Sequence, residues 1–121
     1  AYEFITDLEV VETGFILHDS EEFGCSPDGL VANDGGLEIK CPSDGVHAGY
    51  LIDGKVPTKY YQQVQGCMWV TGRDWWDFMS YHPEMPHLLV RMEKNEEFIE
   101  AMATEVNKAI EIIVKESERW L

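Results

Sequence analysis

The sequence predicts one domain of the α/β (α+β) class, in which a mixed β-sheet is flanked by helices. Segments rich in β-branched and aromatic residues alternate along the chain with segments whose apolar residues recur at helical spacing. Their order is strands, helix, strands, helix, which favours a mixed sheet covered by helices. The chain has 121 residues, of which 45% are hydrophobic and 26% charged, enough for one core and too apolar for a disordered chain.

The first forty residues predict three strands. Residues 8–17 are rich in β-branched and apolar side chains and form the first strand, which a polar turn follows at 18–22. Residues 23–31 and 36–40 form the second and third strands. Between these two, residues 32–36 supply the Asn, Asp and Gly residues that a hairpin turn requires.

The middle of the chain predicts a loop and then a helix. Residues 41–56 contain three glycines after an early proline and are expected to be a loop. Pro57 is a favourable first residue for a helix over 57–71, and Gly72 closes it. The residues expected on the inner stripe of this helix are Tyr60, Val64, Cys67 and Met68.

The last third predicts two strands and a long helix. The strands are expected at 75–81 and 88–92, and the helix at 96–121 with Asn95 as its N-cap. Its acidic face is expected to be solvated, and its apolar stripe to pack on the sheet. That stripe consists of Phe98, Met102, Val106, Ile110, Ile113 and Val114.

Composition restricts the function and the compartment. No segment reaches the roughly 20 apolar residues of a membrane helix. The three cysteines are widely spaced without a CxxC pair, which argues against zinc ribbons and disulfide scaffolds and favours a reducing cytoplasm. The net charge of −14 is unusual for a nucleic-acid binder, because phosphate contacts need Lys and Arg. Residues 1–40 hold ten acidic residues against one basic residue, and acids there can serve as metal ligands.

The stretch SPDGLVANDGGLEIK carries the chemistry. Strand alternation places Leu37 and Ile39 on one face and Glu38 and Lys40 on the other. Asp28 lies on the preceding strand of the same hairpin, and cross-strand neighbours are roughly 5–8 Å apart. Two carboxylates that converge beside a lysine suit a hard divalent cation such as Mg²⁺.

Such a site can hydrolyse a phosphodiester. A bound cation activates a water and holds a phosphate oxygen, while the lysine orients the water or offsets charge at phosphorus. An aspartate, about ten residues, and then Glu-x-Lys on a hydrophobic strand is the signature of the PD-(D/E)xK phosphodiesterases. The alternative is a solvent-facing strand that alternates in the same way after a common Asp-Gly turn.

The flanking sequence resembles the phage lambda exonuclease group, the YqaJ-like viral recombinase family. Four blocks carry the resemblance in order: GCSPDGLV, GGLEIKCP, KYYQQVQGCMWVTG and WWDFMSYHPEM. The resemblance implies a restriction-endonuclease-like core and Mg²⁺-dependent 5′→3′ degradation of one strand at double-stranded DNA ends, with Mn²⁺ able to substitute. It further implies a 3′ overhang that a single-strand annealing protein uses, a toroidal homotrimer, and a phage or prophage protein in the bacterial host cytoplasm.

The resemblance assigns roles residue by residue. Asp28 of SPDG, Glu38 of LEIK and the main-chain carbonyl of Ile39 look like the metal ligands. Lys40 looks like the catalytic lysine.

A helix is expected to complete the pocket. The family's Tyr-x-x-Gln pattern falls on Tyr60 and Gln63, which look like residues near the attacking water and the scissile phosphate. Residues three apart share a helix face, so both can point into one cleft. The alternatives are a core aromatic and a surface glutamine. Lys55 and Lys59 flank the start of this helix and are candidates for phosphate contacts, with plain solvation as the alternative.

The sequence also departs from the family pattern. The family carries a further acidic residue on a helix upstream of the segment that matches Tyr2-Glu3-Phe4, and Glu3 is not expected to replace it. Residues 1–121 are therefore expected to be one PD-(D/E)xK core domain that lacks the family's N-terminal helical part. Two other hypotheses remain open: a non-catalytic module that binds DNA ends or a recombination partner, and a nicking nuclease or phosphodiesterase with another nucleic-acid substrate.

Overall fold

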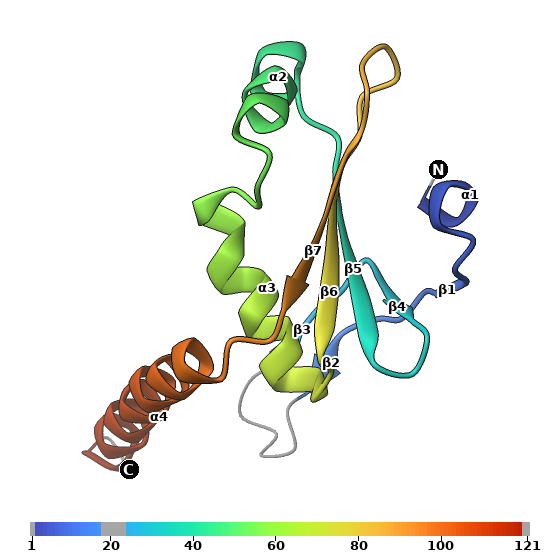
Figure 1. Ribbon diagram of the computed structural model, residues 1–121. Coiled ribbons are helices and arrows are strands. Elements are labelled where there is room, and N and C mark those ends of the chain that lie inside the picture. Colours follow the sequence, from blue (N-terminus) through green and yellow to red (C-terminus); the bar gives the residue numbers. More distant parts are fainter. Residues whose placement is uncertain (1, 18–23, 120–121) are drawn as a thin grey trace.

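A computed structural model of the chain describes residues 2–17 and 24–119. Its main layer is a five-stranded mixed sheet in the order β1-β4-β5-β6-β7, in which only β5 and β6 pair in parallel (Figure 1). The strands of this sheet are β1 (Val10–Val11), β4 (Gly29–Val31), β5 (Gly35–Lys40), β6 (Trp75–Ser80) and β7 (Leu88–Glu93). A separate antiparallel pair is formed by β2 (Ile16–Leu17) and β3 (Gly24–Cys25). The predicted mixed sheet is confirmed.

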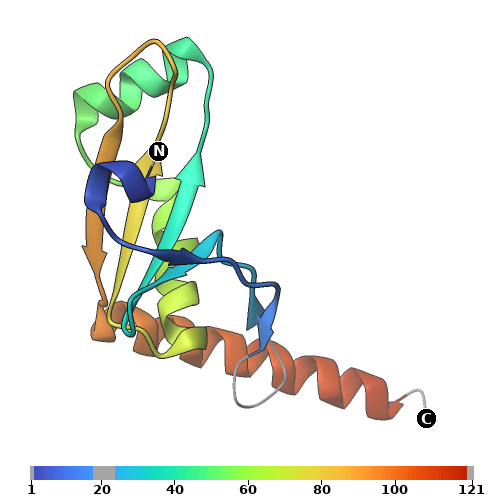
Figure 2. The ribbon, with the colours of Figure 1, turned by 90° about the vertical axis from the view of Figure 1, so that its right-hand side faces the viewer.

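Helices cover both faces of the sheet. The helices α2 (Asp44–Asp53) and α3 (Thr58–Thr71) lie on one face, and the short α1 (Tyr2–Thr6) lies on the other (Figure 1). The helix α4 (Glu96–Arg119) extends away from the body (Figure 2). This arrangement confirms the predicted fold class. Of the helices in the described ranges, none combines the length and the apolar composition that crossing a bilayer requires.

The predicted N-terminal strands are each broken in two. Residues 8–17 contribute β1 and β2, which belong to different sheets, and residues 23–31 contribute β3 and β4. Pro27 lies at the second break, where it cannot donate a ladder hydrogen bond. The predicted turn at 18–22 lies outside the described residues.

The prediction of a loop at 41–56 is wrong, because most of this segment forms α2. The position of the helix depends on His47, which is completely buried. The His47 Nδ1 atom lies 2.7 Å from Ser80 Oγ, and its Nε2 atom lies 2.7 Å from the Pro86 carbonyl oxygen. These contacts hold α2 against the end of β6, and they outweigh the low helix propensity of its two glycines.

The helix α3 follows the prediction closely. Pro57 is its N-cap rather than its first residue, and Gly72 ends it with φ = 71°, a left-handed conformation that favours glycine. Val64, Cys67 and Met68 are buried, as the stripe predicts. They form the core on this face of the sheet, together with Trp76, Met92 and Ile99.

The helix α4 is capped as predicted but packs differently. The Phe98 N–H donates to Asn95 Oδ1 at 3.0 Å, which confirms the N-cap. The buried residue of α4 is Ile99, whereas Ile113 and Val114 are 63% and 48% exposed. The expected packing of the whole stripe on the sheet is wrong, because the helix packs against α3 by its first turns and then leaves the body (Figure 2).

Two glycines of β5 lie under tryptophan rings. The parallel register pairs Gly35 with Trp75 and Gly36 with Trp76. A Cβ atom at either glycine would overlap the ring of its partner. These residues were expected within the hairpin turn, but the turn precedes them and includes Ala32 with φ = 52°. Here glycine serves close packing of a strand rather than a turn.

A buried polar cluster attaches α1 to the opposite face of the sheet. The Tyr2 hydroxyl donates to Asp77 Oδ2 at 2.6 Å, and the Arg91 Nε atom donates to Asp77 Oδ1 at 2.8 Å. Tyr2→Phe removes one of these bonds and is expected to lower the free energy of unfolding by about 1 kcal/mol in a urea titration. Phe4→Leu, at a 94% exposed position of the same helix, is the control. Equal stability of Tyr2→Phe and the wild type would contradict this role.

Candidate active site

Three polar side chains converge where β5 lies beneath α3. Glu38 and Lys40 point to the same face of β5, as strand alternation predicts, and the Lys40 Nζ atom lies 3.0 Å from Glu38 Oε1. Gln63 comes from α3, and its Nε2 atom donates to the same Glu38 oxygen at 3.1 Å. Glu38 is only 3% exposed. The predicted cluster of Glu38, Lys40 and Gln63 is therefore present in the fold.

The electrostatics of this cluster centre on the buried carboxylate. Burial raises the pKa of Glu38, and the nearby charge of Asp28 raises it further. The hydrogen bonds from Lys40 and Gln63 act in the opposite direction. The same pair raises the pKa of Lys40, chiefly because its ammonium group bonds to Glu38. The lysine is therefore held charged beside the carboxylate.

Asp28 reaches β5 from the neighbouring strand. It lies at the bend before β4, and its Oδ2 atom accepts the Ile39 N–H at 2.7 Å. The adjacent register pairs Gly29 with Leu37. The predicted proximity of Asp28 to the Glu-x-Lys strand is present, and the charge of Asp28 helps to raise the pKa of Glu38.

The oxygen donors at this edge suit a divalent cation. Asp28 and Ile39 also line a cavity of about 190 Å³ together with Leu37, on the face of β5 opposite the side chains of Glu38 and Lys40. Among the residues that the structure describes, no three His, Cys, Asp or Glu side chains gather in a metal-binding cluster. The available set is two carboxylates and a main-chain carbonyl, which fits Mg²⁺ or Mn²⁺ completed by water. Glu3 also lines the cavity, where its Oε2 atom accepts the Val10 N–H at 3.1 Å.

Two ammonium groups lie close to the Tyr60 ring. The Lys40 Nζ atom is 4.8 Å from the ring centroid, and the Lys59 Nζ atom is 5.0 Å from it. The ring also stacks on Phe78, with a centroid distance of 5.5 Å. Both residues of the predicted Tyr-x-x-Gln pair therefore reach the cluster, Tyr60 through Lys40 and Gln63 through Glu38.

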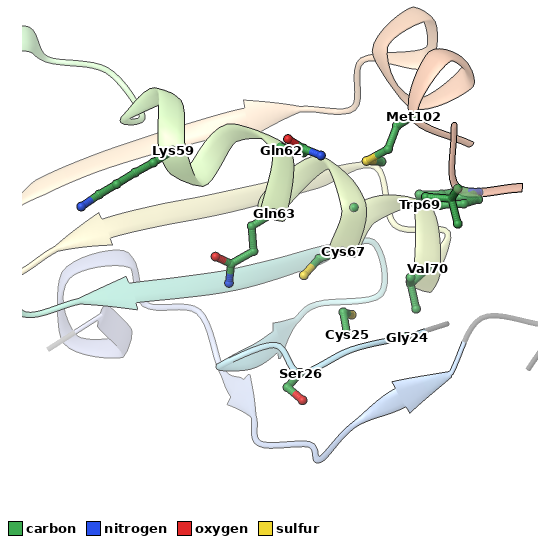
Figure 3. A pocket seen from close by; sticks show the side chains of 12 residues that line it. Gly24, Cys25, Ser26, Lys59, Gln62, Gln63, Cys67, Trp69, Val70 and Met102 are labelled. Carbon is green, nitrogen blue, oxygen red and sulfur yellow. The ribbon is translucent and has the colours of Figure 1, made fainter. Parts of the chain in front are cut away.

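A groove of about 600 Å³ begins at this cluster and runs along α3. Gln63 and Lys59 line it near the start of the helix, and Trp69 and Met102 line it farther on (Figure 3). Lys55 does not line it and lies exposed between α2 and α3. The other lining residues are Gly24, Cys25, Ser26, Gln62, Gly66, Cys67, Val70 and Val106.

The sequence did not predict several residues that lie around the site. Cys25 and Cys67 face each other in the groove (Figure 3), and a hydrogen bond between the thiols lowers the pKa of Cys25 and raises that of Cys67. The parallel register places Phe78 beside Glu38 and Ser80 beside Lys40. Alternation in WWDFMS could have indicated that Phe78 and Ser80 share a face, but not which strand they adjoin.

Comparisons with known proteins identify the family. Residues 1–74 match the model of the YqaJ-like viral recombinase domain. A crystal structure of an alkaline exonuclease, LHK-Exo, from Laribacter hongkongensis superposes with a TM-score of 0.78 at 33% identity, covering 99% of this chain and 68% of that chain. A structure of LHK-Exo in complex with dAMP gives the same values. A comparison with curated protein sequences gives no match. With more than half of its length matched by the family model, the chain belongs to the YqaJ-like viral recombinase domain family.

Proposed function

We propose that this chain is the nuclease core of a DNA exonuclease that acts in recombination. The observation that carries the proposal is the convergence of Glu38, Lys40 and Gln63 beside Asp28. Membership of the YqaJ-like family and similarity to an alkaline exonuclease support it. The reaction is hydrolysis of phosphodiesters at the ends of linear duplex DNA. We further propose that the protein degrades one strand in the 5′→3′ direction and leaves a 3′ overhang. We also propose that it acts in the cytoplasm of the bacterial host.

The residues divide the chemistry between them. Asp28, Glu38 and the Ile39 carbonyl would hold Mg²⁺, which lowers the pKa of a bound water and stabilises charge on a phosphate oxygen. Lys40 is held charged at this site and can offset negative charge that develops on the phosphate. The Gln63 amide fixes the orientation of Glu38. Tyr60 stacks on Phe78 and contacts Lys40, and so limits where Lys40 can lie.

The proposal is tested by Mg²⁺-dependent digestion of a linear duplex labelled at one 5′ end. We expect release of labelled mononucleotides when the labelled end carries a 5′-phosphate, and no cutting of a closed circle. The assay is run with this chain and with a version extended at its N-terminus. If neither cleaves although both bind DNA ends, the chain is a binding module; cutting of the circle would indicate a nicking nuclease.

We also propose that the protein works as a homo-oligomer, a trimer by family resemblance, and delivers its overhang to a single-strand annealing protein. The outer half of α4 supports self-association, because Ile113 and Val114, which share a helix face with Ile110, are 63% and 48% exposed. Exposed apolar residues that cluster in this way are typical of interfaces. Ile113→Glu is expected to shift the mass measured by light scattering towards the monomer. An unchanged mass would place the interface elsewhere.

A further inference from the structure

Most basic side chains of this acidic chain are already engaged. All nine Lys and Arg residues lie within the described ranges, in a chain of net charge −14. Arg73 donates to three main-chain carbonyls around the β4–β5 turn. Six others form ion pairs: Lys40–Glu38, Arg91–Asp77, Lys94–Glu96, Lys108–Glu105, Lys115–Glu111 and Arg119–Glu116. Lys40 already belongs to the proposed reaction centre, and each of the other six shares its charge or its hydrogen bonds with a partner in the protein.

Lys55 and Lys59 are the two that have neither an ion pair nor a main-chain hydrogen-bond partner among the described residues. Both are exposed, and neither lies within ion-pair distance of a carboxylate in the part of the chain that the structure covers. The pKa of Lys59 is raised by hydrogen bonding to the hydroxyls of Tyr50 and Tyr60. Lys59 therefore carries its full charge at neutral pH, with aromatic groups rather than carboxylates as its neighbours.

Lys59 is also placed next to the proposed reaction centre. It lies within 5.0 Å of the same ring centroid that Lys40 approaches to 4.8 Å. It lines the groove that Gln63 shares, and Gln63 contacts Glu38 (Figure 3). Successive phosphates of one strand rise about 3.4 Å along a duplex, so one strand that passes Tyr60 can present phosphates to both lysines.

We propose that Lys59, supported by Lys55, binds a second phosphate of the substrate strand, adjacent to the phosphate that is cleaved at Lys40. This inference rests on the proposed nuclease function and adds a binding subsite to it. The ligand is a nucleic-acid phosphodiester, which the two ammonium groups recognise by charge. The subsite would also help an acidic protein to bind DNA, because Lys59, which has no carboxylate partner among the described residues, lies beside the reaction centre.

The test measures binding without cleavage. A 5′-phosphorylated duplex with a fluorescent label is titrated by anisotropy at several salt concentrations, with Ca²⁺ in place of Mg²⁺. Lys59→Gln is expected to weaken binding by about 3- to 10-fold and to lower the slope of log K against log salt by roughly one. Lys55→Gln gives a smaller change in the same direction. Lys108→Gln is the matched control, since Lys108 is exposed on α4 and paired with Glu105.

The outcomes separate this inference from the proposed function. If the wild type cleaves DNA and Lys59→Gln raises KM while kcat stays within about 2-fold, the subsite is supported. If the wild type cleaves but Lys59→Gln matches Lys108→Gln in affinity and salt slope, the subsite is wrong and the nuclease assignment stands. A wild type that neither binds nor cleaves DNA overturns both.

Discussion

Lys40→Ala is expected to lower kcat for DNA cleavage by about 10²- to 10⁴-fold, the range typical of a lost acid–base or charge-stabilising group. Its ammonium group lies at the centre of the cluster, 3.0 Å from Glu38 and 4.8 Å from the Tyr60 ring. Metal binding should persist, because the substitution removes the cation that competes for the Glu38 carboxylate. Single-turnover cleavage of a labelled duplex measures the first effect, and Mn²⁺ titration by electron paramagnetic resonance measures the second.

Lys108→Ala is the control for this experiment. Lys108 also pairs with a glutamate, at 3.5 Å, but it lies on the exposed part of α4 away from the cluster. The Lys108→Ala variant should cleave DNA at the wild-type rate. Unchanged turnover in Lys40→Ala would remove Lys40 from the chemistry, and loss of Mn²⁺ binding would show that it organises the carboxylates instead.

Glu38→Gln is expected to abolish both metal-dependent stabilisation and cleavage. A ligand that binds the folded state stabilises it by about 2.7 kcal/mol at 100 times its Kd, so Mg²⁺ should raise the Tm of the wild type and leave that of Glu38→Gln unchanged. Without metal, the variant should be at least as stable as the wild type. Burial raises the pKa of Glu38, which means that the folded protein disfavours its charge, and the amide removes that charge at the same volume.

Thermal unfolding with and without Mg²⁺ measures both effects in one experiment. Asp28→Asn provides a second test at an exposed position, where the fold depends less on the side chain. It should also weaken the Mg²⁺-dependent rise in Tm. A rise of wild-type size in both variants would place the metal elsewhere, and no rise in the wild type would exclude it.

The parts of the site that the sequence predicted depend on short-range rules. Strand alternation alone places Glu38 and Lys40 on one face, and a tight hairpin brings Asp28 to the same edge. Helical spacing places Tyr60 and Gln63 on one face of α3. That this face lies over Glu38 and Lys40 was expected from the family resemblance and not from spacing, because α2 separates α3 from β5 in the chain.

The parts that the sequence missed depend on distant partners. The sequence predicts a loop where α2 forms, because the residues that hold its buried His47, Ser80 and Pro86, are 33 and 39 residues away in the chain. Periodicity in α4 indicated an apolar stripe but could not indicate where the protein body ends beneath it. The free charge of Lys59 likewise appears only when the partners of every other basic residue are known.

The contact between Gly36 and Trp76 restricts how this fold can change over evolution. Because the indole ring occupies the space that a side chain at position 36 would need, a substitution at one position alone should disturb the centre of the sheet. Relatives should therefore vary the two positions jointly, with a bulkier residue at 36 accompanied by a smaller one at 76. Such covariation would be visible in an alignment before any relative's structure is known.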